Sequence, residues 1–255
     1  EITPKYNWMS QVGTSIGQQS LYIAEGLYTP DDFDITERED GSRSYQLKKG
    51  LPKPSANVAP GDIKYKDLNE DGVIDSYDRT YKNGFYSTGM PEIVYGFGLN
   101  VSWKGLFVGV FFQGVANASA SLIASPSNII PFTSGRDNAS ARDIIRDRWS
   151  ADEPSNQQVF FPRLHTGAFE HNQMPSTWWM RDAGFLRLKN IELGYEFDKT
   201  LLQRLRMENL RVYVQGNNVA VWDKIKYWDP ELGNANSGAK YPLCRNFTIG
   251  LEITY

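Results

Sequence analysis

The sequence predicts an all-β fold, made of C-terminal antiparallel strands of a large transmembrane β-barrel with long extracellular loops. Two observations predict it. Apolar and polar residues alternate with a period of two over several segments, as in strands with one lipid-facing and one polar face. The connections between these segments are alternately short and long, like the periplasmic turns and extracellular loops of outer-membrane barrels.

The clearest strand is predicted over residues 247–255, where every odd position is apolar and every even position is polar or glycine. Successive side chains of a strand point to opposite faces, so this strand has one apolar and one polar face. In a barrel, the face toward lipid would consist of Phe247, Ile249, Leu251, Ile253 and the aromatic end residue Tyr255. The face toward the lumen would consist of Thr248, Gly250, Glu252 and Thr254.

Four further strands are predicted over residues 93–103, 106–115, 186–197 and 210–216. Lys104-Gly105 predicts a tight turn between the first two, which form a hairpin. In the last of the four the alternation changes phase after Asn217-Asn218, which predicts a β-bulge.

The connections set the expected orientation. Residues 104–105 and 198–209 are short connections, the second with a brief helical pattern, whereas 116–185 and 223–245 are long. Loops of that length are unusual in compact soluble domains. The short turns are therefore expected in the periplasm. Residues 1–92 are expected to be mostly extracellular, and residues 93–255 to be the barrel strands and their loops. A short amphipathic helix is predicted over 141–149 of the first long loop.

Composition excludes some classes of protein and leaves one alternative fold open. A formal net charge of -3 and a pI near 5.5 give no basic surface for nucleic acid. Cys244 is the single cysteine, so neither an internal disulfide nor a cysteine metal site is expected. The alternative is a soluble extracellular β-sandwich that binds carbohydrate, in which the apolar face of residues 247–255 would be buried.

Residues 67–78 follow a calcium-loop pattern, D-x-N-x-D-G-x-I-D-x-x-D. Calcium takes six to eight oxygen ligands, which alternate residues of a tight loop can deliver. The expected ligands are Asp67, Asn69, Asp71, the carbonyl of Val73, Asp75 and Asp78. Gly72 is expected to make the turn and Ile74 to anchor it. The twelfth residue is Asp instead of Glu, which predicts weaker binding, and Mg²⁺ is the alternative ion. The alternative structure is an acidic turn held by its own side-chain to backbone hydrogen bonds.

The sequence contains no recognisable catalytic motif, so an enzyme is not predicted. Nucleophile-elbow, P-loop and dinucleotide patterns do not occur. His165 and His171 lie six residues apart in a long loop and are expected to be solvated, while Asp152-Glu153 precedes Pro154 and predicts a turn.

Several blocks of residues resemble the SusC/RagA-type TonB-linked outer-membrane proteins of Bacteroidetes. The most specific are P-G-D-I-K-Y-K-D at 60–67, leading into the calcium-like loop, and F-L-R-L-K-N-I-E-L-G-Y at 185–195. The other blocks lie in the family's order at 13–17, 24–28, 78–79, 148–149, 162–164, 209–213, 216–218, 241–243 and in the final strand. Cys244 departs from the family, which usually has proline there.

The resemblance implies a 22-stranded plugged barrel in the bacterial outer membrane, of which this chain is the last part. Family members are several times longer and carry a plug and a TonB-contacting segment upstream. The resemblance also implies import of glycan fragments, driven through the TonB complex and shared with a SusD-like surface lipoprotein. Candidate contacts for an oligosaccharide are loop aromatics, and the alternative for each is the outer aromatic girdle or loop packing. These aromatics are Trp178, Trp179, Trp222, Tyr227 and Trp228.

Overall fold

The computed structural model describes residues 3–132, 141–234 and 236–255, which fold mainly as strands. The chain divides into two compact units. The sheet unit consists of residues 89–119, 182–233 and 240–255, and the loop unit of residues 1–88, 120–181 and 234–239. The first long connection therefore supplies much of the loop unit together with the N-terminal residues.

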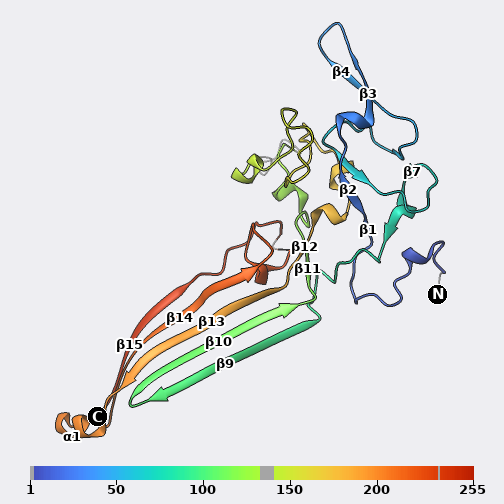
Figure 1. Cartoon of the computed structure of the whole chain (residues 1–255). Helices are drawn as coiled ribbons and strands as arrows, with labels where there is room; N and C mark the ends of the chain where they lie inside the picture. The colour runs from blue at the N-terminus through green and yellow to red at the C-terminus, as the bar shows by residue number, and fades with distance from the viewer. Residues whose placement is uncertain (1–2, 133–140, 235) are drawn as a thin grey trace. The chain divides into compact units, whose positions relative to one another are not determined.

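The sheet unit is an antiparallel sheet of five long strands in the order β15-β14-β13-β10-β9 (Figure 1). The strands are β9 (Ile93–Trp103), β10 (Leu106–Ala116), β13 (Phe185–Glu196), β14 (Asn209–Asp223) and β15 (Asn246–Thr254). Strands of 9–15 residues meet the length that a tilted strand needs to cross a bilayer, about 9–11 residues. All five predicted strands are confirmed.

The fourth strand is longer than predicted because the bulge does not end it. Asn218 and Val219 of β14 lie opposite the single residue Lys189 of β13, and pairing resumes at Ala220. Asn218 adopts a positive φ of 54°, which asparagine tolerates better than most residues. The strand then continues to Asp223, so the predicted bulge is confirmed and the strand extends beyond the regular stretch predicted over 210–216.

The register separates an apolar face from a polar face. One cross-strand row contains Val101, Val108, Leu193, Val214 and Ile249, and the next contains Trp103, Leu106, Tyr195, Val212 and Leu251. On the opposite face a row contains Asn100, Gly109, Glu192, Gln215 and Thr248. Ile249 is 81% exposed, so the apolar face is not buried as a sandwich would require. Its position is that of a lipid-facing surface.

The short connections lie together at one end of the sheet. Lys104-Gly105 joins β9 to β10, and α1 (Lys199–Leu205) joins β13 to β14 after the N-cap Asp198. The end of β15 lies at this same end, beside α1 (Figure 1). The long connections leave from the opposite end, and the second of them contains η9 (Pro230–Leu232). This arrangement confirms the predicted alternation of short and long connections.

The loop unit is built from short strands and 3₁₀ turns. β2 (Ala24–Leu27) pairs with β6 (Ile63–Tyr65), β3 (Phe33–Glu37) with β4 (Arg43–Leu47), β1 (Leu21–Tyr22) with β8 (Arg79–Thr80), and β5 (Lys53–Pro54) with β7 (Val73–Ile74). The 3₁₀ turns are η1 (Asn7–Met9), η2 (Pro30–Asp32), η3 (Ser76–Asp78), η4 (Pro126–Asn128), η6 (Asp143–Arg146), η7 (Glu170–Gln173) and η8 (Thr177–Trp179). β11 (Ser119–Ser121) and β12 (Met180–Asp182) lie where the chain passes between the units.

An aromatic core stabilises the loop unit. Phe160, Phe161 and Trp179 are each 1% exposed and meet edge to face, the geometry that aromatic rings prefer. The predicted amphipathic helix over 141–149 is wrong, because the structure has only the single turn η6 there. The helix does not continue after this turn, because the backbone N–H of Trp149 donates to the carbonyl of Phe161 instead. None of the helices in the described ranges is long and apolar enough to cross a membrane.

Candidate functional site

The calcium-like loop is ordered by its own acidic side chains. The carboxylate of Asp67 accepts hydrogen bonds from the backbone N–H groups of Glu70 at 2.7 Å and Gly72 at 2.8 Å. Asp71 accepts from the N–H of Val73 and from the amide of Asn69. Gly72 has a φ of 83°, so it makes the predicted turn. These side chains crowd around one tight loop, in which Asp71 is exposed to solvent and Asp67 and Asn69 are half-buried.

The second half of the loop is anchored more deeply. Ile74 is buried, as expected. Asp78 is fully buried, and its two carboxylate oxygens accept from the N–H groups of Leu68 and Asp75, both at 2.8 Å. Burial raises the pKa of Asp78 above its usual value. Because both oxygens of Asp78 serve the backbone, Asp75 is the more accessible of the two candidate ligands.

The chemistry of the expected ligands fits a hard divalent cation, since their side chains are four carboxylates and one amide within twelve residues. In the described ranges, no group of three or more His, Cys, Asp or Glu side chains already converges as a metal site. The loop therefore has the hydrogen bonds of the acidic turn, and ion binding would require Asp67, Asp71 and Asp75 to turn toward a common centre. The ligand assignment stays a prediction.

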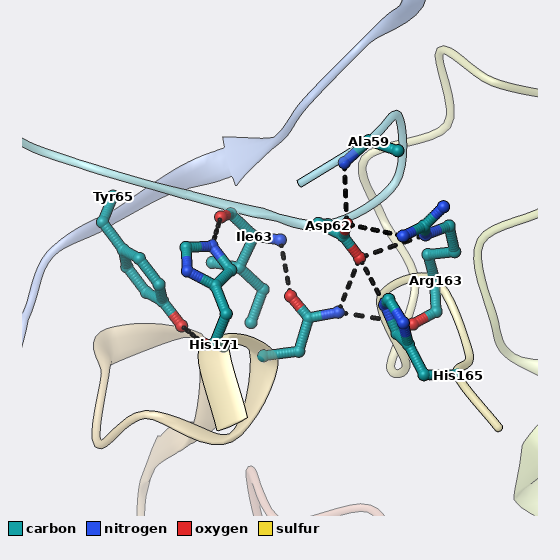
Figure 2. A network of polar contacts seen from close by, with 8 residues as sticks. Ala59, Asp62, Ile63, Tyr65, Arg163, His165 and His171 are labelled. Atoms are coloured by element: carbon teal, nitrogen blue, oxygen red, sulfur yellow. Dashed lines mark hydrogen bonds and ion pairs between the residues drawn. The ribbon is translucent and has the colours of Figure 1, made fainter. Parts of the chain in front are cut away.

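A buried carboxylate that the sequence did not single out organises the loop unit. Asp62 is fully buried and lies at the centre of the network in Figure 2. It forms a two-point ion pair with Arg163, at 3.2 Å to Nε and 3.0 Å to Nη2. His165 Nε2 lies 2.7 Å from Asp62 Oδ1, and Asn172 donates to the same oxygen at 2.9 Å. A charge removed from water is stable only when it is paired and hydrogen-bonded in this way.

The two histidines are not solvated as predicted. His165 faces Asp62, and its ring stacks on Phe169 with the centroids 3.7 Å apart. His171 is 4% exposed, and its Nε2 lies 2.8 Å from the carbonyl oxygen of Ile63. Burial lowers the pKa of His171, because a charged imidazole is costly away from water. Tyr65 donates to the carbonyl of His171 at 2.8 Å (Figure 2).

This network joins segments about one hundred residues apart in sequence. Gly61 has a φ of 89°, and a Cβ on it would lie 2.3 Å from the Trp149 ring. The backbone N–H of Arg163 also donates to the carbonyl of Gly61 at 2.6 Å. Three of the blocks that carry the family resemblance, at 60–67, 148–149 and 162–164, thus meet here. The arrangement holds a long loop in place.

The candidate aromatic contacts in the loop unit are mostly structural. Trp179 lies in the core described above, and its Nε1 donates to the carbonyl of Asn172 at 2.8 Å. A buried ring offers no face for stacking, so the structure favours the loop packing that the sequence left as the alternative for Trp179. Trp178 is half-buried and donates to the carbonyl of Phe160 at 3.2 Å.

The aromatic candidates of the sheet unit differ from one another. Trp222 is 55% exposed and lies on the apolar face, in one row with Tyr95 and Leu186. This places it at the loop end of the apolar face, where outer-membrane barrels carry aromatic girdles, so its position favours the girdle that the sequence left as the alternative to a sugar contact. Tyr227 and Trp228 are half-buried in the long loop, and Trp228 Nε1 donates to the carbonyl of Gly233. These two stay candidates.

Two groups of ion pairs lie on the polar face of the sheet. Arg187 is nearly fully buried and lies 2.5 Å from Asp229 and 2.8 Å from Glu231, which also contacts Lys189 at 3.0 Å. Arg211 lies 2.5 Å from Glu192 and stacks over Phe107 at 4.3 Å. Charged groups on this face and apolar groups on the other are the arrangement of a barrel wall between lumen and lipid.

Two curated relatives cover most of the chain. TonB-dependent receptor P26 of Formosa agariphila is 26% identical over 206 residues, which are 76% of this chain and 20% of the receptor. TonB-dependent receptor SusC of Bacteroides thetaiotaomicron is 26% identical over 202 residues, which are 78% of this chain and 18% of the receptor. The chain spans about a fifth of the length of the curated relatives it matches. No protein-family model matches the chain.

A solved structure supports the fold. The RagAB peptide importer in its closed-closed state superposes with a TM-score of 0.56 at 20% identity, covering 92% of this chain and 23% of the importer chain. The predicted resemblance to SusC-like TonB-dependent receptors is confirmed, as are the strand-dominated fold of a barrel transporter and the location in the bacterial outer membrane. These relatives are named as receptors and importers, which agrees with a protein that is not an enzyme.

Proposed function

We propose that this chain forms part of the wall and the outer loops of an outer-membrane importer for oligosaccharides. The carrying observation is the two-faced sheet, with an apolar face that includes the 81%-exposed Ile249 and an opposite face of amides and paired charges. A surface of this kind separates lipid from an aqueous lumen. The similarity to TonB-dependent receptors supports energy coupling through TonB, and the similarity to SusC supports a SusD-like surface lipoprotein as partner.

The polar face favours a neutral, hydroxyl-rich cargo. Asn100, Asn190 and Gln215 present amide groups, each of which both donates and accepts hydrogen bonds, as sugar hydroxyls require. The cations Arg187 and Arg211 are already paired with carboxylates, so they do not form an open site for anions. Peptides are the second candidate cargo, since peptide import is the activity named for RagAB.

The test is uptake by cells that carry the complete gene or lack it. Fluorescent oligosaccharides of defined linkage and peptides of similar mass are compared as probes. We expect saturable oligosaccharide uptake that depends on the gene and stops when a protonophore removes the proton-motive force. Uptake of the peptides alone would contradict the glycan proposal. Co-purification of a surface lipoprotein with the full-length protein tests the partner.

We also propose that residues 67–78 bind Ca²⁺ as a structural ion in an extracellular loop. The number of acidic oxygens and the φ of 83° at Gly72 support it. Hydrogen exchange of this segment is measured in the full-length protein with Ca²⁺ and with EDTA, and Ca²⁺ should slow it. Asp71→Ala should abolish the difference, whereas Asp34→Ala on the exposed strand β3 should not. Equal exchange with and without Ca²⁺ would assign the loop to the acidic turn.

A further inference from the structure

The polar face of the sheet contains a hollow of about 230 Å³ between β9, β10, β13 and β14. We propose that it binds one pyranose ring of an oligosaccharide during transit through the lumen. This inference rests on the proposed function and names a contact site for its cargo. It assigns the site to the wall of the barrel, away from the loop aromatics that the sequence suggested.

Hydrogen-bonding side chains from neighbouring strands converge on the hollow. Asn100, Glu192 and Gln215 belong to one cross-strand row, in which Gly109 lies between the first two. Asn190 belongs to the adjacent row on the same face. Three amides and one carboxylate therefore border the same small space.

Phe111 supplies an apolar surface where the alternation calls for a polar residue. It pairs with Gly98 and Asn190 on the polar face, and its side chain is 43% exposed. A Cβ on Gly98 would lie 3.2 Å from Phe111 Cδ2, and one on Gly96 would lie 3.1 Å from Phe111 Cζ. The Cδ2–Cε2–Cζ edge of the ring thus lies over two glycines of β9. The residue keeps 43% of its surface exposed on the polar face of the sheet.

Glycine also gives the hollow its depth. A Cβ on Gly109 would lie 2.7 Å from Asn100 Oδ1, so the Asn100 side chain lies across a position without a side chain. Gly98 likewise leaves no room for a Cβ, which would lie 2.8 Å from the carbonyl oxygen of Val110. Larger residues at these positions would fill the space between Phe111 and the amides.

The charge of the hollow favours a neutral ligand. Glu192 is the carboxylate on its border, and Arg211 Nη2 lies 2.5 Å from Glu192 Oε1. The guanidinium is fixed in turn by stacking over Phe107 and Tyr213 at 4.3 and 5.1 Å. Because its charge is balanced, Glu192 remains an acceptor for hydroxyl groups without attracting cations strongly.

A sugar ring has the matching chemistry. Its C–H face can lie on an aromatic ring, while the hydroxyl groups on its edge both donate and accept hydrogen bonds. The volume of about 230 Å³ is below the range of about 300–1,000 Å³ typical of sites for drug-sized ligands. The hollow therefore accommodates one ring of a longer chain, as a passing contact requires.

The experiment measures uptake kinetics of the full-length protein with fluorescent gluco-, fructo- and manno-oligosaccharides as probes. Phe111→Ala and Asn190→Ala should each raise KM about fivefold to tenfold for the imported probe, as expected for the loss of one binding contact. The maximal rate and the amount of folded barrel should stay within about twofold, since binding alone is weakened. Phe111→Tyr should restore KM. Gln113→Ala, on the same face of β10 but outside the hollow, is the matched control.

The outcomes separate the inference from the proposed function. If wild-type protein imports an oligosaccharide and neither alanine variant changes KM, the hollow is not a sugar site and the importer proposal stands. If wild-type protein imports peptides and none of the sugars, both fail. If the variants lower the amount of folded barrel or cause leakage without changing KM, the hollow is filled by the protein's own chain, and the inference is overturned.

Discussion

Asp62 lies where three blocks that carry the family resemblance, separated in sequence, meet in the structure. Gly61 gives the Trp149 ring room, Asp62 binds Arg163, and the backbone of Arg163 returns to Gly61. A change in one block therefore affects the other two. A neutral residue in place of Asp62 would leave Arg163 and the other hydrogen-bond donors around Asp62 unpaired.

Asp62→Ala is expected to destabilise the loop unit by about 3–5 kcal/mol, the usual cost of removing one partner of a buried ion pair. Segments 59–66 and 162–173 should become protease-sensitive in the full-length protein, with the barrel still assembled. Asp31→Ala removes an exposed carboxylate from η2 and is the control. Equal protease resistance of the two variants would show that the network contributes little.

His171 gives the loop unit a dependence on pH. Its pKa is lowered by burial, and Nδ1 has no hydrogen-bond partner in the part of the chain that the structure describes. Below the unfolded pKa of about 6.5, the histidine takes up a proton in the unfolded chain but not in the folded chain. The free energy of unfolding is therefore highest above this pH and falls as the pH decreases. The slope should reach at most about 1.4 kcal/mol per pH unit. Thermal unfolding between pH 8 and pH 5 measures it, and His171→Gln should flatten the curve.

The sequence predicted the local residues of these sites and missed the distant partners. Gly72 and Ile74 were assigned correctly because a twelve-residue loop determines their positions by itself. His165 and His171 were assigned to solvent because their partners, Asp62 and Ile63, lie more than one hundred residues away. The one hint in the sequence was that the blocks at 60–67 and 162–164 both carry the family resemblance, although nothing in the sequence shows that they are in contact. For Trp179 the sequence left sugar contact and loop packing both open for the same reason, since its core neighbours Phe160 and Phe161 are not adjacent to it in sequence.

At the scale of elements, the strands were predictable because alternation is a local property with a fixed period. β9 begins and ends at the residues predicted for it. The pairing of β14 beyond its bulge was not predictable, because the partner of Ala220 is Leu188 of the neighbouring strand. The helix expected over 141–149 failed for a similar reason, since the backbone of Trp149 pairs with Phe161.

Adjacent residues of β15 test the assignment of its faces. Ile249 lies in the apolar row with Val214, and Thr248 in the polar row with Gln215. Ile249→Arg should cost about 2–4 kcal/mol near the middle of the membrane, while Thr248→Arg should be mild. The amount of heat-modifiable barrel in outer-membrane fractions of the full-length protein is the measurement. Glu252 is a less suitable control, because Arg211 lies 3.9 Å from it and a new arginine would face a like charge. If both variants lost the same amount of folded barrel, the assignment of the lipid-facing and lumen-facing sides would be wrong.

At the scale of the whole molecule, the five strands are one section of a larger wall. In the described residues β9 pairs only with β10, and β15 only with β14, so each outer strand keeps one row of unpaired backbone groups. Backbone groups at a sheet edge cannot stay unpaired in lipid, and barrels solve this by closing on themselves. The described sheet has two such edges, and the chain spans about a fifth of the length of its curated relatives.

We therefore expect that the 255 residues alone do not form a soluble monomer. The loop unit has its own core around Phe160, Phe161 and Trp179, so it would keep part of its structure. The sheet unit would expose residues such as Leu251 together with two open edges, the combination that drives strand pairing between copies. Size-exclusion chromatography of the isolated chain in water should give aggregates, and detergent should be needed to keep it dispersed. A monomer that unfolds cooperatively without detergent would mean that the apolar face is covered within the chain, and the β-sandwich alternative would then replace the barrel wall.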